Sequence, residues 1–345
     1  MPHVESLDPK KHAFANRLGQ KPLTKFKDYR QSINVKLIKH DDPAQMLKGT
    51  YKFVKATWAD SPLDNDSATN DQMTDALHQM LSGKALGLGL ETVNLMFEIG
   101  GITHIDAQQI TRQRIGVTFS AQCTGDRFLT HNDVLVEESI AQDPELLKGF
   151  IDSTLATKDS YSQMVDSQKV SIQAARSILP RNIETFYYMN TNLTTLLFFH
   201  QKRIDDGSQT WQMNVIAQQM ADAVCEVYPE LKEVFEKNKS RFKFQKEASA
   251  DRKNTFSTGL YVPRDDEFNY HNRDFLYPVK KNDMHFTNTP IEETHYWGDR
   301  LITKEQYNFI KSQYEQLDNE NHDSNFSNEE IINRVKKLNE SIGLI

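Results

Sequence analysis

The stretch QQITRQRIGVTFSAQCTGDRF, residues 108–128, decides how the rest of the chain is interpreted. Arg112 and Arg114 stand two residues apart, and Arg127 follows a turn of small polar residues that contains Cys123. Three arginines around a thiol and a glycine turn suit an anion, most simply a phosphate, because a planar guanidinium group matches phosphate oxygens two at a time. The alternative is a solvated basic turn beside a strand, since no standard short motif matches here.

Length and composition limit the kind of protein. The 345 residues give room for one large domain or two ordinary ones, and 38% of them are hydrophobic. The net charge of -7 argues against a general nucleic-acid or membrane-surface binder. The sequence has no apolar run long enough to predict a membrane span. Two cysteines without disulfide or metal-ligand spacing, and an N-terminal stretch without an apolar core, favour a cytoplasmic protein.

Periodicity along the chain predicts both strands and helices. A partly alternating pattern at 34–42 and a β-compatible apolar run at 86–99 indicate strands, with a turn at Gly100-Gly101. Residues 132–139 fit either a strand or the start of a helix. Helices are expected over residues 43–57, 71–81, 105–114, 145–174, 180–203, 211–227, 303–317 and 327–342. The aromatic-rich stretches 268–278 and 295–302 are expected to be loops.

Several separated blocks of the chain resemble the flavin-dependent thymidylate synthases. That family's signature is Arg-His-Arg, seven or eight residues and a serine; here Arg112-Gln113-Arg114 is followed by eight residues and Cys123. Gln109 stands three residues before the first arginine, as the family places it. Further matches are Thr57, Glu91, Phe97-Glu98-Ile99, Gly101, Ala175-Arg176, Leu179-Pro180, Asn192, Leu196, Arg203 and Gln209. Because these blocks occur in the same order as in the family, together they indicate the resemblance more specifically than any single block does.

The resemblance covers roughly residues 34–230 and implies an α/β fold with a mixed sheet packed against long helices. On this basis residues 34–230 are a thymidylate synthase-like catalytic domain. Residues 1–33 are a polar arm with little structure of its own, and residues 231–345 are a C-terminal extension of unknown role. The resemblance further implies a homotetramer with active sites at subunit interfaces.

The resemblance also implies a reaction. The family transfers a carbon from methylenetetrahydrofolate to C5 of dUMP, FAD reduced by NADPH provides the hydride, and no side chain bonds covalently to the base. Carried over by position, Arg203 would be the catalytic residue that stabilises charge on the base. The nucleotide-binding residues would be Gln109, Arg112, Cys123, Arg127, Arg176 and Arg203. The flavin-binding residues would be Thr57, Arg112, Gln113, Arg114, Asn192 and Gln209.

The chain departs from the family pattern mostly on the flavin side. Gln113 replaces the signature histidine, and Cys123 replaces the serine. Gly125 stands where the family has a phosphate-binding arginine, so Arg127 would have to reach back to replace it. The positions where many members have arginine and asparagine beside the flavin are Thr194 and Phe198. These departures imply that the pyrimidine nucleotide is kept while FAD binding is altered or weakened.

Two other functions fit the same residues. One is a pyrimidine nucleotide hydroxymethylase on the same fold that omits the flavin hydride step, which the lost flavin-side residues favour. The other is a nucleotide-binding scaffold without catalysis that uses its C-terminal extension to bind a partner.

Single residues keep alternative roles as well. Cys123 is either a nucleophile activated by nearby arginines or a serine-sized packing residue. Arg176 and Arg203 are either ligand-binding or helix-surface arginines. Asn192 either contacts the flavin or is a buried polar residue bonded to a neighbouring helix. Gln113 is either an adapted contact or the mark of a lost one.

Overall fold

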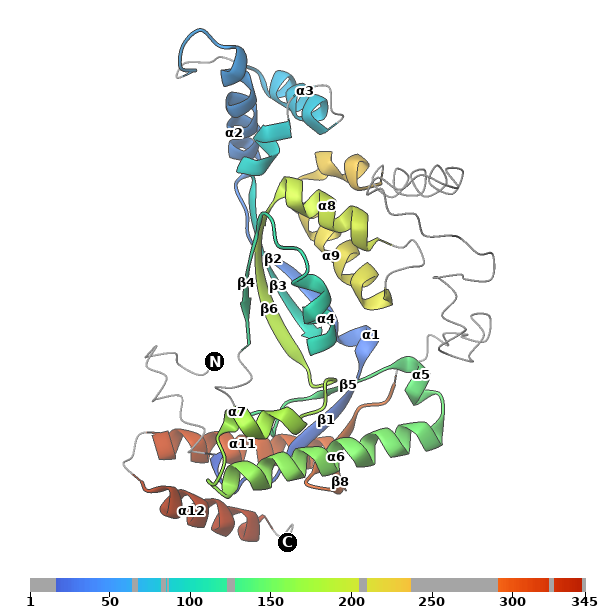
Figure 1. Cartoon of the computed structure of the whole chain (residues 1–345), viewed down its shortest axis with the longest axis vertical. Helices are drawn as coiled ribbons and strands as arrows, with labels where there is room; N and C mark the ends of the chain where they lie inside the picture. Colours follow the sequence, from blue (N-terminus) through green and yellow to red (C-terminus); the bar gives the residue numbers. More distant parts are fainter. Residues whose placement is uncertain are drawn as a thin grey trace, which may run out of the picture.

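Two four-stranded sheets form the frame of the described part of the chain and follow one another along its long axis (Figure 1). The computed structural model describes residues 17–63, 68–81, 85, 87–122, 128–204, 210–236, 291–322 and 326–342. The first sheet has the strand order β5-β1-β7-β8, and the second has the order β2-β3-β6-β4. The expected α/β fold with long helices is confirmed.

The second sheet is antiparallel throughout and is covered by helices on one face. Its strands are β2 (Asn34–Lys39), β3 (Asn94–Ile102), β6 (Thr185–Asn192) and β4 (Val117–Ala121). Alternate residues of β3, such as Leu95 and Phe97, are fully buried, as the period of a strand requires. They pack in one cluster with α8 (Leu193–Arg203) and α9 (Trp211–Val227), which lie over the sheet in Figure 1.

Shorter elements complete this half of the molecule. They are α1 (Tyr29–Ser32), α2 (Pro43–Lys55), η3 (Ala56–Trp58), α3 (Asn70–Leu81), η4 (Gly87–Thr92), α4 (His104–Ile110) and η6 (Pro229–Leu231). The helices expected from Pro43, near Asp71 and from Trp211 are confirmed. None of the helices among the described residues is long and apolar enough to cross a membrane.

The expected helix over 180–203 is wrong in its first half. The segment TFYYMNTN forms strand β6, which pairs with β3 on one side and with β4 on the other. Its residues alternate between buried and half-buried, and they are mostly aromatic or β-branched, which favours a strand. Asn192 then ends the strand and caps α8, so the helical spacing of the apolar residues spans two different elements.

Two further predictions fail at glycines and serines. The turn expected at Gly100-Gly101 is absent, because β3 continues to Ile102 through an irregular register. Gly101 has a φ of +66°, and a Cβ there would lie 1.7 Å from the carbonyl oxygen of Ser32, so glycine is required. The helix expected over 145–174 ends at Asp166, and α7 begins only at Ile172, capped by the Ser171 side chain.

The first sheet joins segments from both ends of the chain. Strand β1 (Leu23–Asp28) pairs in parallel with β5 (Val134–Val136) and antiparallel with β7 (Thr294–Trp297), which continues into β8 (Arg300–Ile302). The prediction that residues 1–33 have little structure is therefore wrong for β1, and the loop expected over 295–302 is a hairpin. The domain boundaries at 33 and 230 stay a prediction.

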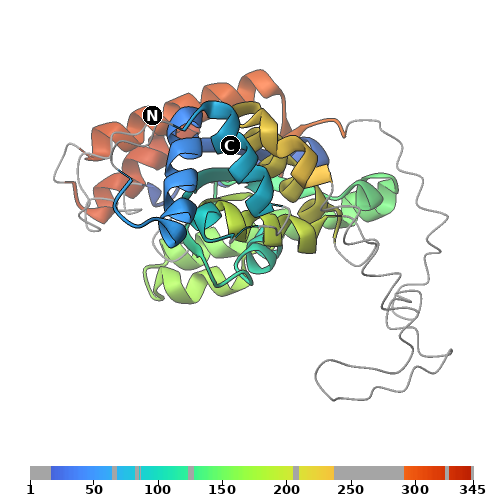
Figure 2. The ribbon, with the colours of Figure 1, turned by 90° about the horizontal axis from the view of Figure 1, so that it is seen from above.

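Long helices cover both faces of this first sheet. The helix α6 (Pro144–Asp166) packs on β1 through Phe26, whereas α11 (Lys304–His322) packs through Leu23. These two side chains are three positions apart along the strand, an odd number, so they point to opposite faces. Figure 2 shows the red C-terminal helices and the green α6 on opposite sides of the view. The remaining elements here are α5 (Glu138–Ala141), α7 (Ile172–Ala175), η5 (Arg176–Ile178) and α12 (Asn328–Ser341).

Buried hydrogen bonds fix the C-terminal helices to the rest of the chain. Trp297 Nε1 donates to Tyr314 Oη at 2.9 Å, and that hydroxyl donates to Asn339 Oδ1 at 2.8 Å. The Tyr314 ring stacks on His131, with 5.4 Å between ring centroids. His131 Nδ1 accepts from the Leu23 amide, and its Nε2 lies 2.6 Å from Gln20 Oε1. The two helices expected near the C-terminus are confirmed and belong to this packed half.

A buried lysine supports the chain just before β5. Lys158 of α6 has no exposed surface, and its Nζ donates to the main-chain oxygen of Asn132 at 2.6 Å. Burial lowers the pKa of Lys158 to about 7, and the charge of Asp133 offsets only part of this effect. One turn further along α6, the Tyr161 hydroxyl accepts from the Leu129 amide at 3.5 Å. Together these contacts hold the segment 129–133 against α6.

Replacing Lys158 with methionine should change how the free energy of unfolding depends on pH. The lysine pKa is about 7 in the folded chain and about 10.4 in the unfolded chain, so between these values the unfolded chain holds more protons. The wild-type free energy of unfolding therefore rises with pH in this window, by up to about 1.4 kcal/mol per pH unit, relative to Lys158→Met. Urea titrations across the window measure both slopes.

The matched control for this change is Lys148→Met, which removes an exposed lysine from the same helix. Its pH dependence should follow that of the wild type. Parallel curves for Lys158→Met and the wild type would show that Lys158 is not a perturbed group.

Candidate functional site

The arginine-rich stretch begins where α4 ends. A capping box starts this helix: the Thr103 amide and hydroxyl both donate to Asp106 Oδ2 at 2.8 Å. The helix stops at Ile110, so the expected helix over 105–114 is too long. Arg112 therefore lies in the loop that follows, and it does not share a helix face with Gln109.

The loop 111–116 runs alongside α8 in the opposite direction. At its start, Arg203 Nη2 from the last turn of α8 donates to the main-chain oxygen of Gln109 at 2.7 Å. At its end, Gly116 meets the first turn of α8, where a Cβ would lie 2.1 Å from Thr195 Oγ1. Gly116 also has a φ of +72°, so both its backbone conformation and its close approach to Thr195 require glycine. This close approach fixes the loop against the helix.

Positive charge gathers where this loop meets the end of α8. Burial, and then the charge of Arg112, lower the pKa of the half-buried Arg203 guanidinium group. Arg112 and Arg114 are exposed, and the described residues offer neither of them an ion pair. Exposed arginines held close to another arginine favour a bound anion. The loop can therefore hold a phosphate or a similar group.

The start of α8 carries two polar residues with different partners. Asn192 Oδ1 accepts from the Thr195 amide at 2.8 Å, so Asn192 is the N-cap of α8. Thr194 Oγ1 is buried, and no hydrogen-bond partner exists for it among the described residues. A buried hydroxyl without a partner is uncommon in native proteins and is consistent with a ligand at this end of the helix.

The structure brings together only some of the residues that the sequence assigned to a site. Gln109, Arg112, Gln113, Arg114, Asn192 and Arg203 lie along the loop 111–116 and α8. Thr57 is exposed in η3 beyond α2, and Arg176 is exposed in η5 after α7. Figure 1 places α2 and α7 at opposite ends of the molecule. Cys123, Arg127 and Gln209 lie outside the described residues.

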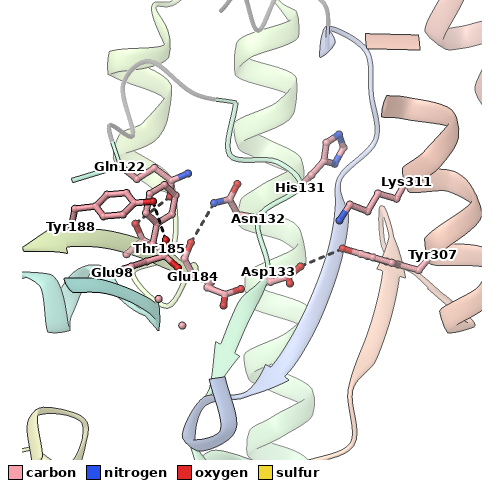
Figure 3. A pocket seen from close by; sticks show the side chains of 13 residues that line it. Glu98, Gln122, His131, Asn132, Asp133, Glu184, Thr185, Tyr188, Tyr307 and Lys311 are labelled. Carbon is pink, nitrogen blue, oxygen red and sulfur yellow. Dashed lines mark hydrogen bonds between the residues drawn. The ribbon is translucent and has the colours of Figure 1, made fainter. Parts of the chain in front are cut away.

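A cavity that the sequence did not indicate adjoins the end of β4. It has a volume of about 490 Å³ and lies between the second sheet, the segment before β5 and α11 (Figure 3). Its residues include Gln122 at the end of β4, Glu98 and Tyr188 from the sheet, and Tyr307 and Lys311 from α11. Tyr307 is a buried position and Lys311 an exposed position of a helix far along the chain, so no sequence pattern connects them with the arginine loop.

Substituting alanine for Gly116 should lower stability and move the loop. The change forces a side chain into a left-handed backbone conformation, at a cost of about 1–3 kcal/mol, and adds the clash with Thr195. Urea unfolding measures the loss. The control is Gly49→Ala inside α2, where nothing lies within 4 Å of the new methyl group, and it should gain about 0.5–1 kcal/mol. Equal effects of both changes would contradict the close approach.

Comparisons with known proteins show which proteins the chain is similar to. No sequence match to a curated protein was found. In fold, the chain is similar to a UMP/dUMP methylase, PolB from Streptomyces cacaoi, bound with 5-Br dUMP: the identity is 15%, the TM-score is 0.50, and 61% of this chain and 96% of that chain are covered. It is also similar to Thymidylate Synthase X from Helicobacter pylori with FAD and dUMP, at 17% identity, TM-score 0.46, and coverage of 60% and 98%.

The family comparison covers the arginine loop and both helices beside it. The model of the family described as "Thymidylate synthase complementing protein" matches residues 36–230, more than half of the chain. The match contains the second sheet, α4, α8 and α9, and it ends before β7, β8, α11 and α12. The chain therefore belongs to the family of thymidylate synthase complementing proteins.

Proposed function

We propose that the protein is a divergent flavin-dependent thymidylate synthase. It transfers a one-carbon unit from methylenetetrahydrofolate to C5 of dUMP or a related pyrimidine nucleotide. The observation that carries the proposal is the convergence of Arg203 and Arg112 at Gln109. An enzyme that handles a nucleotide monophosphate needs such a group of arginines.

Arg203 is the proposed catalytic residue. Its guanidinium group is half-buried, and one of its nitrogens is held by the main-chain oxygen of Gln109, so its direction is set before substrate binds. When C5 of the pyrimidine becomes nucleophilic, negative charge develops on a carbonyl oxygen of the base. A preorganised cation beside this carbonyl oxygen stabilises the charge without reorganisation during the reaction.

The nucleotide site is proposed to include residues from more than one subunit. Gln109, Arg112 and Arg203 come together within one chain, whereas Arg176 lies near the opposite end of the molecule. A second copy that brings its Arg176 to the arginine loop would complete the site, in keeping with a homotetramer. Cys123 and Arg127, which follow β4 in the sequence, are the further proposed nucleotide ligands.

The arginine loop fits the phosphates of FAD. Arg112 and Arg114 are exposed, Gly116 lets the backbone come close to α8, and the buried Thr194 hydroxyl has no partner among the described residues. Thr57, Gln113, Asn192 and Gln209 are the other proposed flavin ligands. When bound and reduced by NADPH, the flavin would supply the hydride that turns the transferred carbon into a methyl group. This chain's residues bind and orient the reactants.

The proposal is tested by incubating the full chain with FAD, NADPH, methylenetetrahydrofolate and dUMP, with UMP in parallel. Mass spectrometry should find the methylated nucleotide, and added FAD should give the protein a yellow chromophore. The variant Arg203→Ala should lose about 100-fold or more in kcat, because a preorganised charge at the reacting ring is removed. Lys202→Ala, which removes the neighbouring exposed cation, should behave as the wild type.

Each rival function has its own outcome in this experiment. A product that carries one more oxygen than the methylated nucleotide, formed without a bound flavin, would favour the hydroxymethylase. Nucleotide binding without turnover would favour the scaffold. Activity that survives Arg203→Ala would overturn the assigned catalytic residue.

A further inference from the structure

The cavity at the end of β4 is built from two parts of the chain that differ in origin. One wall comes from the family-matched region: Gln122, the segment His131–Asp133, and residues at the edge of the second sheet. The other wall comes from Tyr307 and Lys311 of α11, beyond the residues that the family model matches. Figure 3 shows the Lys311 side chain pointing from α11 into this space. The C-terminal extension thus adds two side chains to a cavity whose other residues belong to the family-matched region.

The cavity is lined by residues that flank the segment 123–127 in the sequence, and this segment carries the proposed nucleotide ligands Cys123 and Arg127. Gln122 directly precedes residues 123–127, and His131–Asp133 follow them after a short buried turn. That turn is held by Lys158 and Tyr161 of α6. Because Cys123 directly follows Gln122 in the sequence, a ligand that contacts Cys123 would lie near the cavity.

Each carboxylate that lines the cavity already has partners. Glu98 accepts from the Tyr188 hydroxyl at 3.0 Å and from Lys36 at 3.2 Å. Lys27 donates to both oxygens of Glu184, at 2.8 and 2.9 Å, and lies 3.7 Å from Asp133. Asp133 also accepts from the Tyr307 hydroxyl at 3.3 Å. These pairs reduce the negative charge that a bound ligand would meet.

Two donors remain in the cavity after this pairing. The Lys311 ammonium group has no ion pair or hydrogen bond among the described residues, and it is accessible to solvent. Gln122 Oε1 accepts from Thr185 at 3.2 Å, which leaves its amide nitrogen to donate into the cavity. Beside them stand the rings of Phe186 and Tyr188, with centroids 5.9 Å apart. The cavity therefore combines a free cation, an amide donor and an aromatic wall.

We propose that this cavity binds the anionic tail of an aromatic reactant, with Lys311 as the anion-binding residue that the C-terminal extension supplies. The inference rests on the proposed function, whose reactants carry such tails. A phosphate on the nucleotide and the glutamate carboxylates on the folate share this chemistry, because both present oxygens that accept from an ammonium group.

The test measures binding by calorimetry, without turnover, on the full chain saturated with FAD. The variant Lys311→Met keeps the stem and removes the charge, and its control Lys304→Met removes an exposed cation of the same helix that does not line the cavity. One pair of probes is dUMP and deoxyuridine, which lacks the phosphate. The other pair is methylenetetrahydrofolate and a tetrahydropterin without the glutamate tail.

Lys311→Met should weaken one tailed probe by about tenfold and leave its tailless counterpart unchanged. A loss confined to dUMP identifies the phosphate as the anion, and a loss confined to methylenetetrahydrofolate identifies the carboxylates. Lys304→Met should bind all four probes as the wild type does. If Lys311→Met binds both tailed probes as tightly as the wild type, the inference falls while the proposed function stands. If the wild type binds neither tailed probe, both fall.

Discussion

The hydrogen bond from the buried Lys158 to Asn132 stabilises the region where the two sheets meet. The Lys158 ammonium group donates to the Asn132 carbonyl from inside α6, where desolvation opposes its charge. Next to it, His131 is bonded to Gln20 and Leu23 and stacked on Tyr314. The beginning, middle and end of the chain therefore converge on two consecutive residues, His131 and Asn132. Burial of so many polar groups is tolerated because nearly all of them have partners.

This junction lies away from the arginine loop, so the packing at the junction leaves the loop exposed to solvent and to anions. The arginine loop lies on the second sheet's helices, and the cavity lies at the sheet's other end. Both are connected through β4 and β6, which are rigid because their backbone bonds continue across the sheet. The part of the chain that the structure describes gives Arg112 and Arg114 no ion pair, so a bound anion would supply their counter-charge.

The sequence was sufficient for the family and for much of the fold, and insufficient where a contact joins distant segments. Helices such as α2 and α9 carry a proline start or a clear apolar face, so periodicity identifies them. Strand β6 was missed because its apolar residues also fit a helical spacing, and pairing on both sides decided the matter. Strand β1 was missed because Lys25 and Lys27, which form ion pairs, made it resemble a solvated arm.

The candidate site shows the same division. Gln109, Arg112 and Arg203 were assigned from spacing. In the structure Arg203 donates a hydrogen bond to Gln109, and Arg112 lies close enough to act on the Arg203 charge. The end of α4 at Ile110 was not visible in the sequence, and neither was the close approach of Gly116 to Thr195 across the chain. Lys311 could not be assigned, since distant contacts such as Tyr314 on His131 and Tyr307 to Asp133 place α11 beside the cavity.

The pairing of β1 with β7 has a consequence for the order in which the molecule is made. Phe26 of β1 pairs with Thr294, so nearly the whole chain must be synthesised before that edge of β1 is covered. Until then β1 presents open backbone donors and acceptors, the feature that invites pairing with another chain. Such distant pairing also forms slowly, because a long loop must close first. The C-terminal hairpin thus covers the edge of β1 only late in synthesis. Until then, Lys25 and Lys27 of β1 keep this exposed edge soluble.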